Sequence, residues 1–515
     1  MVGVKKTSLN NYLTMKKTLF PITLVFTALS LFAQKEDNVW LFGDVGEPDS
    51  TRATTILDFS GGAEPEINSL YKFIGFYVCS TTISDGEGNL QLYSNGVHIY
   101  DNQHEIIENG EEFVSPEEFP VGYAMRQGAM FFPYPGQHDK YLYCHGDFVY
   151  YYFDGHLVTG CSPLTYSVIE KDNDAWKVTE KKVALTQDTV RSGRFTGVRH
   201  ANGRDWWLIV PPTFGSNRFQ KYLIDPSGIH LHDKQEVGQI FNPGLGQGAV
   251  SPDGEWVAYY NYFGIFPVSI GISIDIYRFD RCTGQLSDHN QIIYENQGGR
   301  GGAAFSPNSR FLYISASDYL YQFDLWADDI PASRVTVAQW DGFIDEQGNA
   351  VRFHSLKLGP DGKIYIGSTA GLSRFMGIIE NPNLPGIDCN VKQHSIYLPT
   401  YIRWAMPDHP VGFNLGPLEG SPCDTILTAA EEKIAESFSL YPNPSAGVVS
   451  MELPDSSWDA VQVTTAAGQL VNTTVLEGKS RNVELNLTNL PDGLYFVSLM
   501  KDGIRSAPTK LVITR

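Results

Sequence analysis

The chain has 515 residues, of which 19% are charged and 13% aromatic, with 49 glycines and 29 prolines. This composition excludes disordered and fibrous proteins, and the length exceeds one ordinary core, so two or three domains are expected. The 38 basic and 58 acidic side chains give a net charge of −20. Such a charge repels phosphate backbones, so no nucleic-acid partner is expected.

Residues 1–33 have the pattern of an export segment. Lys16 and Lys17 form a positive region after Met15, and Leu19–Ala33 is an apolar run. This run is shorter than the ~20 residues that a membrane span needs, so we expect a signal peptide and no integral membrane span. The residues before Met15 are interpreted as an over-extended start, and cleavage is expected after Ala33.

One pattern recurs through residues 34–418. The segments "AVSPDGEWVAYY", "AFSPNSRFLYIS" and "KLGPDGKIYIGS" begin at positions 249, 304 and 357. Each predicts a strand, a turn and a second strand, because Pro sets φ at the second turn position and Asp or Asn suits the next corner. Counting three weaker copies, the turn residues recur every 51 to 66 positions, at Asp85, Gly136, Asn202, Asp253, Asn308 and Asp361.

A repeat of about fifty residues with four strands per unit predicts an all-β fold, a β-propeller. Each radial sheet then covers its neighbour and few strand edges stay exposed. Six units are visible, and we expect residues 39–62 and 411–418 to pair as a split blade that closes the ring. Seven blades are favoured, with six and eight as alternatives for the count and a β-solenoid or two sandwiches as alternatives for the fold.

The same region resembles a known group of proteins. The segments "LFGDVG", "LDFSGG", "TTISDGEGNLQLYSNGVHIYD", "FDRCTGQLSD" and "IIENPNLPGIDC" are similar to those of secreted bacterial β-propellers related to WD-repeat-like surface proteins. The resemblance covers nearly all of residues 39–415. It implies architecture and export, and the group carries no agreed enzymatic activity.

The composition changes after Leu418. Residues 419–437 are a predicted linker with one short helix, and residues 438–515 show short alternating stretches that predict a small Ig-like β-sandwich. Pro442 and Pro444 cannot donate ladder hydrogen bonds, so the segment that enters this sandwich is expected to be extended and unpaired. A generic fibronectin-like module is the alternative.

The motifs "YPNPSAG", "GQLV", "LPDGLYFVSL" and "KLVI" occur in order at the end of the chain. They resemble the C-terminal sorting domain (type A) of the type IX secretion system. The resemblance implies that an outer-membrane translocon and a sortase-like peptidase are partners, and that the product is secreted or attached to the outer cell surface. The sorting-signal residues implied are Tyr441, Pro442, Asn443, Pro444, Gly447, Gly468, Gly493, Lys510, Leu511 and Val512.

Export permits disulfides, and the chain has six cysteines without a CxxC pair or a ligand-like His/Cys spacing. No metal site is predicted from them. Three bridges could form, and a bridge between Cys389 and Cys423 would tie down the end of the large domain.

No catalytic residues are predicted, because HExxH, GxSxG and P-loop patterns are all missing from the sequence. "GGRGG" (298–302) is interpreted as a close approach to the propeller axis and not as a phosphate loop. "SDGEGN" (84–89) favours a hairpin turn over a calcium loop, so no cofactor is expected, with calcium as a weak alternative. His200, His354 and His394 are interpreted as structural.

Four arginines form the only constellation that suggests a ligand. Arg126, Arg194, Arg300 and Arg352 each lie eight to ten residues before a turn residue. Equivalent positions of a propeller lie on a ring, so the four guanidiniums are expected at one mouth of the channel, where they could bind a carboxylate, a phosphate or a sulfated sugar. The alternative is that each arginine pairs with an acid of the adjacent blade.

The sequence therefore predicts a secreted or cell-surface propeller that binds or scaffolds an anionic glycan or small anion. The alternative is an extracellular propeller enzyme acting on glycans or lactones, and a third reading is a purely structural surface component. An enzyme should show an axial pocket with acids or histidines of perturbed pKa. A binding module should expose aromatic side chains, with Trp206, Trp207 and Tyr262 as candidates.

Overall fold

The structure is a computed structural model. It describes residues 35–44, 51–62, 64–72, 74–153, 156–191, 193–241, 244–265, 269–295, 299–424, 438–453, 458–465, 470–476, 482–501, 504–505 and 509–515. The predicted signal peptide and the predicted linker helix lie outside these residues. The chain divides into two compact units, Met1–Leu418 and Glu419–Arg515. In the described part, no helix is long and apolar enough to cross a membrane.

The described residues of the first unit form seven antiparallel sheets that follow one another along the chain. The first two have three strands each: β1 (Val39–Gly43), β2 (Thr54–Asp58) and β3 (Glu66–Leu70), then β4 (Thr81–Ser84), β5 (Leu90–Ser94) and β6 (Ile99–Asp101). The third has five: β7 (Ala129–Pro133), β8 (Lys140–Phe153), β9 (His156–Asp172), β10 (Ala175–Thr186) and β11 (Val190–Arg191).

The remaining four sheets have four strands each. They comprise β12 (Thr196–Arg199), β13 (Trp206–Val210), β14 (Arg218–Asp225) and β15 (Gly228–Glu236), then β16 (Leu245–Val250), β17 (Trp256–Ile265), β18 (Ser269–Phe279) and β19 (Leu286–Glu295). The last two comprise β20 (Gly301–Phe305), β21 (Phe311–Ala316), β22 (Tyr319–Asp324) and β23 (Val335–Gln339), then β24 (Phe353–Leu358), β25 (Ile364–Ser368), β26 (Ser373–Ile379) and β27 (Val391–Ile402). Two 3-10 helices, Pro331–Ser333 and Gly386–Cys389, lie in connections.

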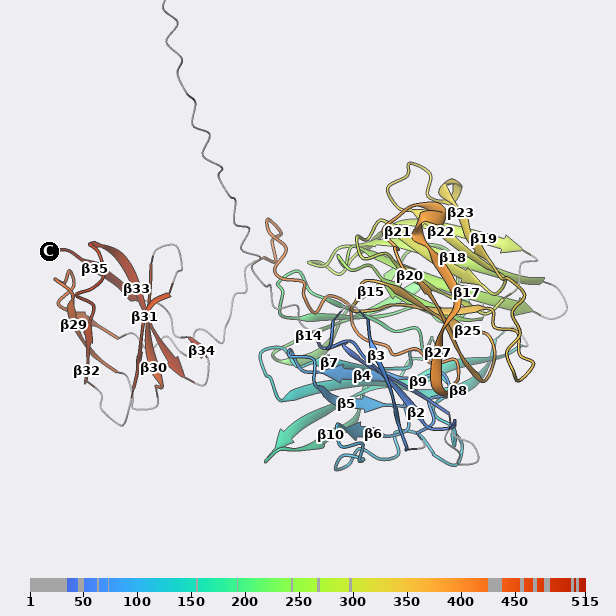
Figure 1. The fold of residues 1–515 in the computed structure, drawn as a ribbon, viewed down its shortest axis with the longest axis horizontal. Helices are drawn as coiled ribbons and strands as arrows, with labels where there is room; N and C mark the ends of the chain where they lie inside the picture. Colours follow the sequence, from blue (N-terminus) through green and yellow to red (C-terminus); the bar gives the residue numbers. More distant parts are fainter. Residues whose placement is uncertain are drawn as a thin grey trace, which may run out of the picture. The chain divides into compact units, whose positions relative to one another are not determined.

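These sheets are the blades of a β-propeller. First strands of successive sheets contact each other, as β4 does with β7, β16 with β20 and β20 with β24. The ring closes where β27 contacts β1, β2 and β3, and Figure 1 shows orange β27 beside blue β2 and β3. Across this junction, the ring centroids of Trp40 and Tyr365 are 5.3 Å apart. The predicted seven-bladed propeller is confirmed.

The repeated turn joins the first and second strands of a blade. In the fifth sheet, the Gly254 N–H donates to the Ser251 carbonyl at 2.8 Å, and the Trp256 N–H donates to Ser251 Oγ at 2.9 Å. Ser306 accepts the same two kinds of hydrogen bond in the sixth sheet. All six predicted turn residues lie at this place in sheets two to seven: Asp85, Gly136, Asn202, Asp253, Asn308 and Asp361.

The predicted split blade is wrong. In the described residues the first sheet contains β1, β2 and β3, and residues 411–418 pair with the fourth sheet instead. Val411 forms a bridge with Val198 and Pro417 with Asn202, whereas Asp408 forms a bridge with Thr81 of the second sheet. Residues 403–418, which we call the axial segment, therefore contact several blades in turn. At the ring junction, side-chain packing and a backbone hydrogen bond from the Tyr401 N–H to the Thr51 carbonyl, at 2.7 Å, replace the expected strand pairing of the two chain ends.

Glycine is required where the sixth blade meets the axis. A Cβ on Gly302 would lie 2.0 Å from Oε1 of Gln247 and 2.9 Å from the backbone nitrogen of Leu356. We expect Gly302→Ala to lower the free energy of unfolding by about 1–3 kcal/mol, because Gln247 and Leu356, which are hydrogen-bonded to each other, must move to make room for the methyl group. Urea unfolding measures this loss. Gly61→Ala is the control, since no atom lies within 4 Å of a Cβ there, and an equal loss in both variants would contradict the prediction.

The second unit is a small β-sandwich of two sheets. One comprises β28 (Leu440–Tyr441), β29 (Val448–Glu452) and β32 (Asn482–Asn486). The other comprises β30 (Ala460–Thr465), β31 (Leu470–Val475), β33 (Gly493–Lys501), β34 (Ile504–Arg505) and β35 (Thr509–Ile513). The core between them contains Val449, Val461, Val497 and Leu511. The arrangement agrees with the predicted Ig-like sandwich.

Candidate ligand-binding site on the propeller axis

Three of the four predicted arginines converge at one end of the axis. Arg126, Arg194 and Arg300 lie just before β7, β12 and β20, the first strands of three different blades. They line one cavity of about 220 Å³, which we call the arginine cavity. Its other side chains include His354 and the aromatic rings of Tyr77, Tyr262 and Trp404.

His354 and the axial segment hold two of these arginines. Arg126 Nη2 lies 3.1 Å from His354 Nε2 and 3.5 Å from the Trp404 carbonyl. Because a guanidinium can only donate, His354 Nε2 accepts, and the ring proton is placed on Nδ1, 3.1 Å from Ser355 Oγ. The Arg300 guanidinium lies over the Trp404 ring, 4.7 Å from its centroid. The indole therefore supports the one exposed guanidinium of the three.

Arg194 is held by neutral groups. Its Nη1 donates to Asn261 Oδ1 at 2.7 Å, and its Nη2 donates to the Gly244 carbonyl. Arg191 Nη2 donates to the same Asn261 oxygen at 2.9 Å. Among the described residues, none of Arg126, Arg194 and Arg300 forms an ion pair with a carboxylate. The charge of the cavity is thus not neutralised by direct acidic contacts.

The pKa values reflect this excess of positive charge. Burial lowers the pKa of Arg126 to about 10, with the charge of Arg300 acting in the same direction and that of Asp408 opposing it. Burial, followed by the charges of Arg191 and Arg126, lowers the pKa of Arg194 well below its usual range. The pKa of His354 is also lowered strongly, by burial and by Arg126 and Arg300, so the ring is neutral. An anion in the cavity would relieve this repulsion.

Arg352 does not line the arginine cavity. Its Nη1 lies 2.7 Å from Asp318 Oδ1, and its guanidinium lies over Trp340. It precedes β24, whose pairing with β25 shifts register between Phe353 and Leu356. The expected ring position of Arg352 is therefore wrong, and His354 contributes to the cavity from this blade instead. Arg352 follows the ion-pair alternative.

Two glutamine side chains lie beyond the arginines along the axis. Gln127 Nε2 donates to the Gly248 carbonyl at 3.0 Å, and Gln127 Oε1 accepts from the Gly248 N–H at 2.7 Å. Gln247 makes the same pair of bonds with Leu356, at 2.5 and 3.2 Å. Each glutamine reaches a blade two positions on in the ring. Sequence reasoning missed both, since a lone glutamine carries no signal of a partner more than a hundred residues away.

Two of the three aromatic side chains that were expected on a binding surface are buried in the fold. Trp206 and Trp207 are fully buried in β13, against Phe132 and Phe279 respectively. Successive strand residues point to opposite faces, and in a propeller each face is covered by a neighbouring blade. The binding role expected for Trp206 and Trp207 is therefore wrong. Tyr262, by contrast, lines the arginine cavity.

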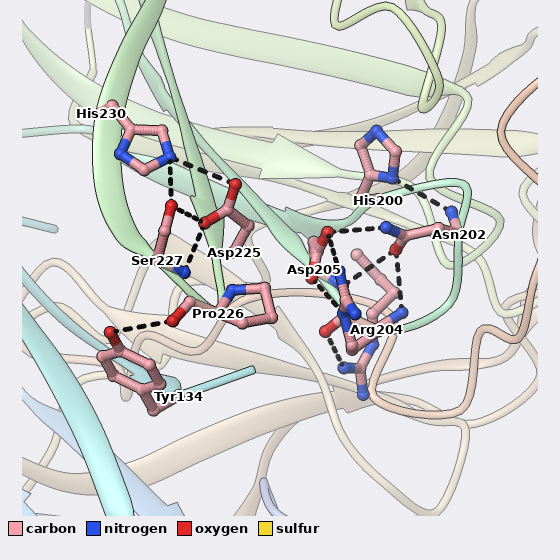
Figure 2. A network of polar contacts seen from close by, with 10 residues as sticks. Tyr134, His200, Asn202, Arg204, Asp205, Asp225, Pro226, Ser227 and His230 are labelled. Carbon is pink, nitrogen blue, oxygen red and sulfur yellow. Dashed lines mark hydrogen bonds and ion pairs between the residues drawn. The ribbon is translucent and has the colours of Figure 1, made fainter. Parts of the chain in front are cut away.

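Ser227, His230 and Asp225 lie together in the hairpin between β14 and β15 (Figure 2). Ser227 Oγ is 3.4 Å and Asp225 Oδ2 is 3.2 Å from His230 Nε2. A catalytic triad needs the serine and the acid on different imidazole nitrogens. Here both approach the same nitrogen, and Ser227 Oγ donates to Asp225 at 2.6 Å. The cluster stabilises a turn.

The second network in Figure 2 belongs to the turn between β12 and β13. His200 Nδ1 accepts from the Asn202 N–H at 3.0 Å, and its Nε2 lies 3.1 Å from the Cys282 carbonyl. His394 Nε2 lies 2.9 Å from Asp341 Oδ2. Both histidines have protein partners, as a structural role requires. No cluster of three or more His, Cys, Asp or Glu residues that could hold a metal occurs within the described ranges.

The cysteine pairing differs from the expectation. Cys79, Cys144, Cys161 and Cys389 are free and buried, and Cys282 and Cys423 are each disulfide-bonded. The expected Cys389–Cys423 bridge is therefore wrong. Cys389 ends a 3-10 helix inside the core of the sixth and seventh blades.

The predicted sorting residues of the small sandwich meet at its first and last segments. Asn443 Nδ2 donates to the Lys510 carbonyl at 2.7 Å, and the Val512 N–H donates to Asn443 Oδ1 at 2.9 Å. The Ser445 N–H donates to the Val512 carbonyl at 2.9 Å. The segment with two prolines is thus paired, contrary to expectation, because the amide of Asn443 replaces the missing ladder bonds.

The other sorting residues have separate places. Tyr441 is exposed, and Leu511 is buried in the sandwich core. Gly447 has φ +117°, and a Cβ there would lie 2.9 Å from Thr488 Cα, so glycine is required. Gly493 begins β33. Gly468 lies outside the described residues.

Comparison with known proteins identifies the small sandwich. Residues 439–514 match the secretion system C-terminal sorting domain. This domain indicates export through the type IX secretion system, interaction with its machinery, and a surface or extracellular location. No curated protein sequence is significantly similar to the chain.

Solved structures with a similar fold include a proposed 6-phosphogluconolactonase from Bacteroides fragilis, 12% identical with a TM-score of 0.37, covering 73% of this chain and 98% of that one. A periplasmic gluconolactonase from Pseudomonas aeruginosa is 14% identical with a TM-score of 0.33, covering 68% and 93%. A quinoprotein alcohol dehydrogenase-like protein from Bacteroides thetaiotaomicron is 12% identical with a TM-score of 0.35, covering 74% and 79%. Similarity at this level gives no information about the chemistry of this chain.

Proposed function

We propose that this protein is a secreted or surface-attached binding protein whose propeller takes a small anionic ligand in the arginine cavity. The observation that carries the proposal is the convergence of Arg126, Arg194 and Arg300 on one cavity without an acidic partner in the described structure. At about 30 Å³ per water, the cavity of about 220 Å³ holds roughly seven waters. This space suits a single carboxylated, phosphorylated or sulfated sugar.

The chemistry of the lining supports this ligand class. Guanidinium groups bind carboxylates, phosphates and sulfates through paired hydrogen bonds. Tyr77, Tyr262 and Trp404 add aromatic lining that can contact the apolar C–H groups of a sugar. The overall charge of −20 repels anions from the remaining surface, so a local cluster of cations can be selective.

Calorimetric titration of the secreted protein tests the proposal. The probes are inorganic phosphate and glucose 6-sulfate, each at low and at high salt. We expect saturable binding that weakens as salt rises, because the attraction is electrostatic. Absence of binding at low salt would contradict the proposal.

For export, we propose that an N-terminal signal peptide delivers the chain across the inner membrane and that the translocon then reads the sorting domain. A sortase-like peptidase acts on the domain afterwards. The propeller is of the WD-repeat-like surface type, and the domain limits are 34–418 for the propeller, 419–437 for the linker and 438–515 for the sorting domain.

Asn443 offers a test of the sorting domain. We expect Asn443→Ala to reduce the amount of protein outside the cell, because two hydrogen bonds to β35, each contributing about 1 kcal/mol, are lost where the sorting motifs meet. Quantitative immunoblotting of medium, surface and periplasm measures the change. Asn472→Ala in β31 is the matched control, and equal export of both variants would contradict this role of Asn443.

One observation favours the alternative, an extracellular enzyme acting on glycans or lactones. Burial raises the pKa of Asp408 to about 7, and this carboxyl lines a second cavity on the axis. A carboxyl that titrates near neutral pH suits general acid–base catalysis. Hydrolysis of a gluconolactone or an aryl glycoside by the secreted protein, lost in Asp408→Asn, would support this alternative.

A further inference from the structure

The second cavity has a volume of about 500 Å³ and lies at the other end of the first strands of the blades. Its lining comes from the ends of β16, β20 and β24 and from the turns that follow them. The arginine cavity, by contrast, is lined by residues at or before the starts of these strands. Gln127 and Gln247, with their backbone partners, lie between the two ends. We call this space the Asp408 cavity.

Asp408 is fixed in the lining by the axial segment. Its N–H donates to the Ser80 carbonyl at 2.9 Å, and its own carbonyl accepts from Thr81 Oγ1 at 2.8 Å. The residue is 5% exposed, and its carboxyl accepts hydrogen bonds from Gln127. Oδ2 nevertheless has no hydrogen-bond partner among the described residues. A buried carboxyl oxygen without a partner on a cavity wall indicates a missing donor.

Lys357 lines the same cavity from β24. In the described structure its ammonium group makes neither a hydrogen bond nor an ion pair, although the charges of Asp408 and Asp37 act on it from a distance. The cavity thus contains a donor and an acceptor that do not satisfy each other.

The lining of the Asp408 cavity is close to charge balance. Two lysines and three aspartates contribute, and His409 is neutral, since burial and Lys357 lower its pKa strongly. Nδ1 of His409 also lacks a partner among the described residues. The lining therefore does not select an anion, unlike the arginine cavity.

We propose that the Asp408 cavity is a second binding site, which takes an uncharged polyhydroxylated ligand of mono- or disaccharide size. A hydroxyl group both donates and accepts, so one sugar hydroxyl can donate to Asp408 while it accepts from Lys357. Apolar side chains such as Phe59, Met130, Phe305 and Phe413 complete the lining and match the C–H faces of a sugar ring. This site does not depend on anion binding at the arginine cavity.

The test is a calorimetric titration of the full-length secreted protein with glucose, galactose, mannose and maltose. We expect at least one of these sugars to bind saturably. Lys357→Met should weaken that binding by about ten-fold or more, since the variant loses a hydrogen bond from a charged donor to the ligand. Lys392→Met is the matched control, because Lys392 pairs with Glu380 and lines neither cavity.

Asp408→Asn provides a second variant if Lys357→Met does not fold, because the amide keeps the size of the carboxyl. If the new NH2 group takes the place of Oδ2, a donor replaces the acceptor that faces the cavity. If it takes the place of Oδ1, it faces the donors of Gln127 and loses their hydrogen bonds. In either case we expect a similar loss of sugar affinity. Undetectable binding of all four sugars, or unchanged affinity in the folded variants, would overturn the inference. Loss of sugar binding in Arg300→Ala would overturn it too, by assigning the sugar to the arginine cavity.

Discussion

Replacing Arg300 by Ala is expected to weaken binding of glucose 6-sulfate by about ten-fold or more. The guanidinium lies over Trp404 at the exposed side of the arginine cavity and has no acidic partner among the described residues. Its loss removes a charged hydrogen bond to the ligand, which contributes about 1.5–3 kcal/mol. Calorimetry at low salt measures the affinity. The thermal midpoint should change little, because Arg300 is exposed and forms no ion pair within the described part of the chain.

Arg352→Ala is the matched control for this experiment. Arg352 occupies a similar position in the sequence repeat, but the structure pairs it with Asp318 outside the cavity. We expect unchanged affinity in this variant and a loss of about 0–1 kcal/mol in stability, the usual range for an exposed ion pair. If both variants bind the sulfated sugar equally well, the convergence of arginines has no part in binding.

Asp408→Asn is expected to change how stability depends on pH. Burial raises the pKa of Asp408 from 3.8 to about 7, against the charges of Lys357 and Arg126. Between these two values the folded protein holds a proton that the unfolded chain has released, so the free energy of unfolding falls as pH rises through this window. Above pH ~7 the penalty is fully present, and a rise of this size corresponds to about 4 kcal/mol.

The amide that replaces this carboxyl in the variant would carry no such penalty. The variant should therefore match the wild type near pH ~4 and exceed its stability above pH ~7 by up to about 4 kcal/mol. Urea unfolding at both pH values measures the difference. Burial also raises the pKa of Glu36 to about 7, but this effect is present in both proteins and cancels in the comparison. Parallel stability curves for the two proteins would contradict the expectation.

The sequence predicted the blades well because their signal is local. Each turn is built by residues within a few positions of one another, as Ser251, Gly254 and Trp256 show. Pro, Asp and Gly at fixed places therefore identify the turns of six of the seven sheets. Ring closure depends on contacts between distant residues, such as Trp40 with Tyr365. A local sequence pattern carries no information about such long-range contacts. The split blade was therefore predicted wrongly.

The site was predicted in part. Repeat alignment finds Arg126, Arg194 and Arg300 because equivalent positions of a propeller lie at the same height on the axis. It fails for Arg352, where the register shift in β24 changes which side chain reaches the cavity. Asp408 and Trp404 belong to the axial segment, which is not part of the repeat. The positions of Asp408 and Trp404 depend on the path of the axial segment across the blades. No local sequence pattern predicts that path.

Anomalous diffraction from crystals soaked in selenate, an isostere of sulfate, tests the central claim most directly, because it locates the anion. The account predicts a selenium peak in the arginine cavity, within hydrogen-bond distance of the Arg126, Arg194 and Arg300 guanidiniums. A map in which selenate occupies other arginines, such as Arg352, while this cavity contains only water would contradict it.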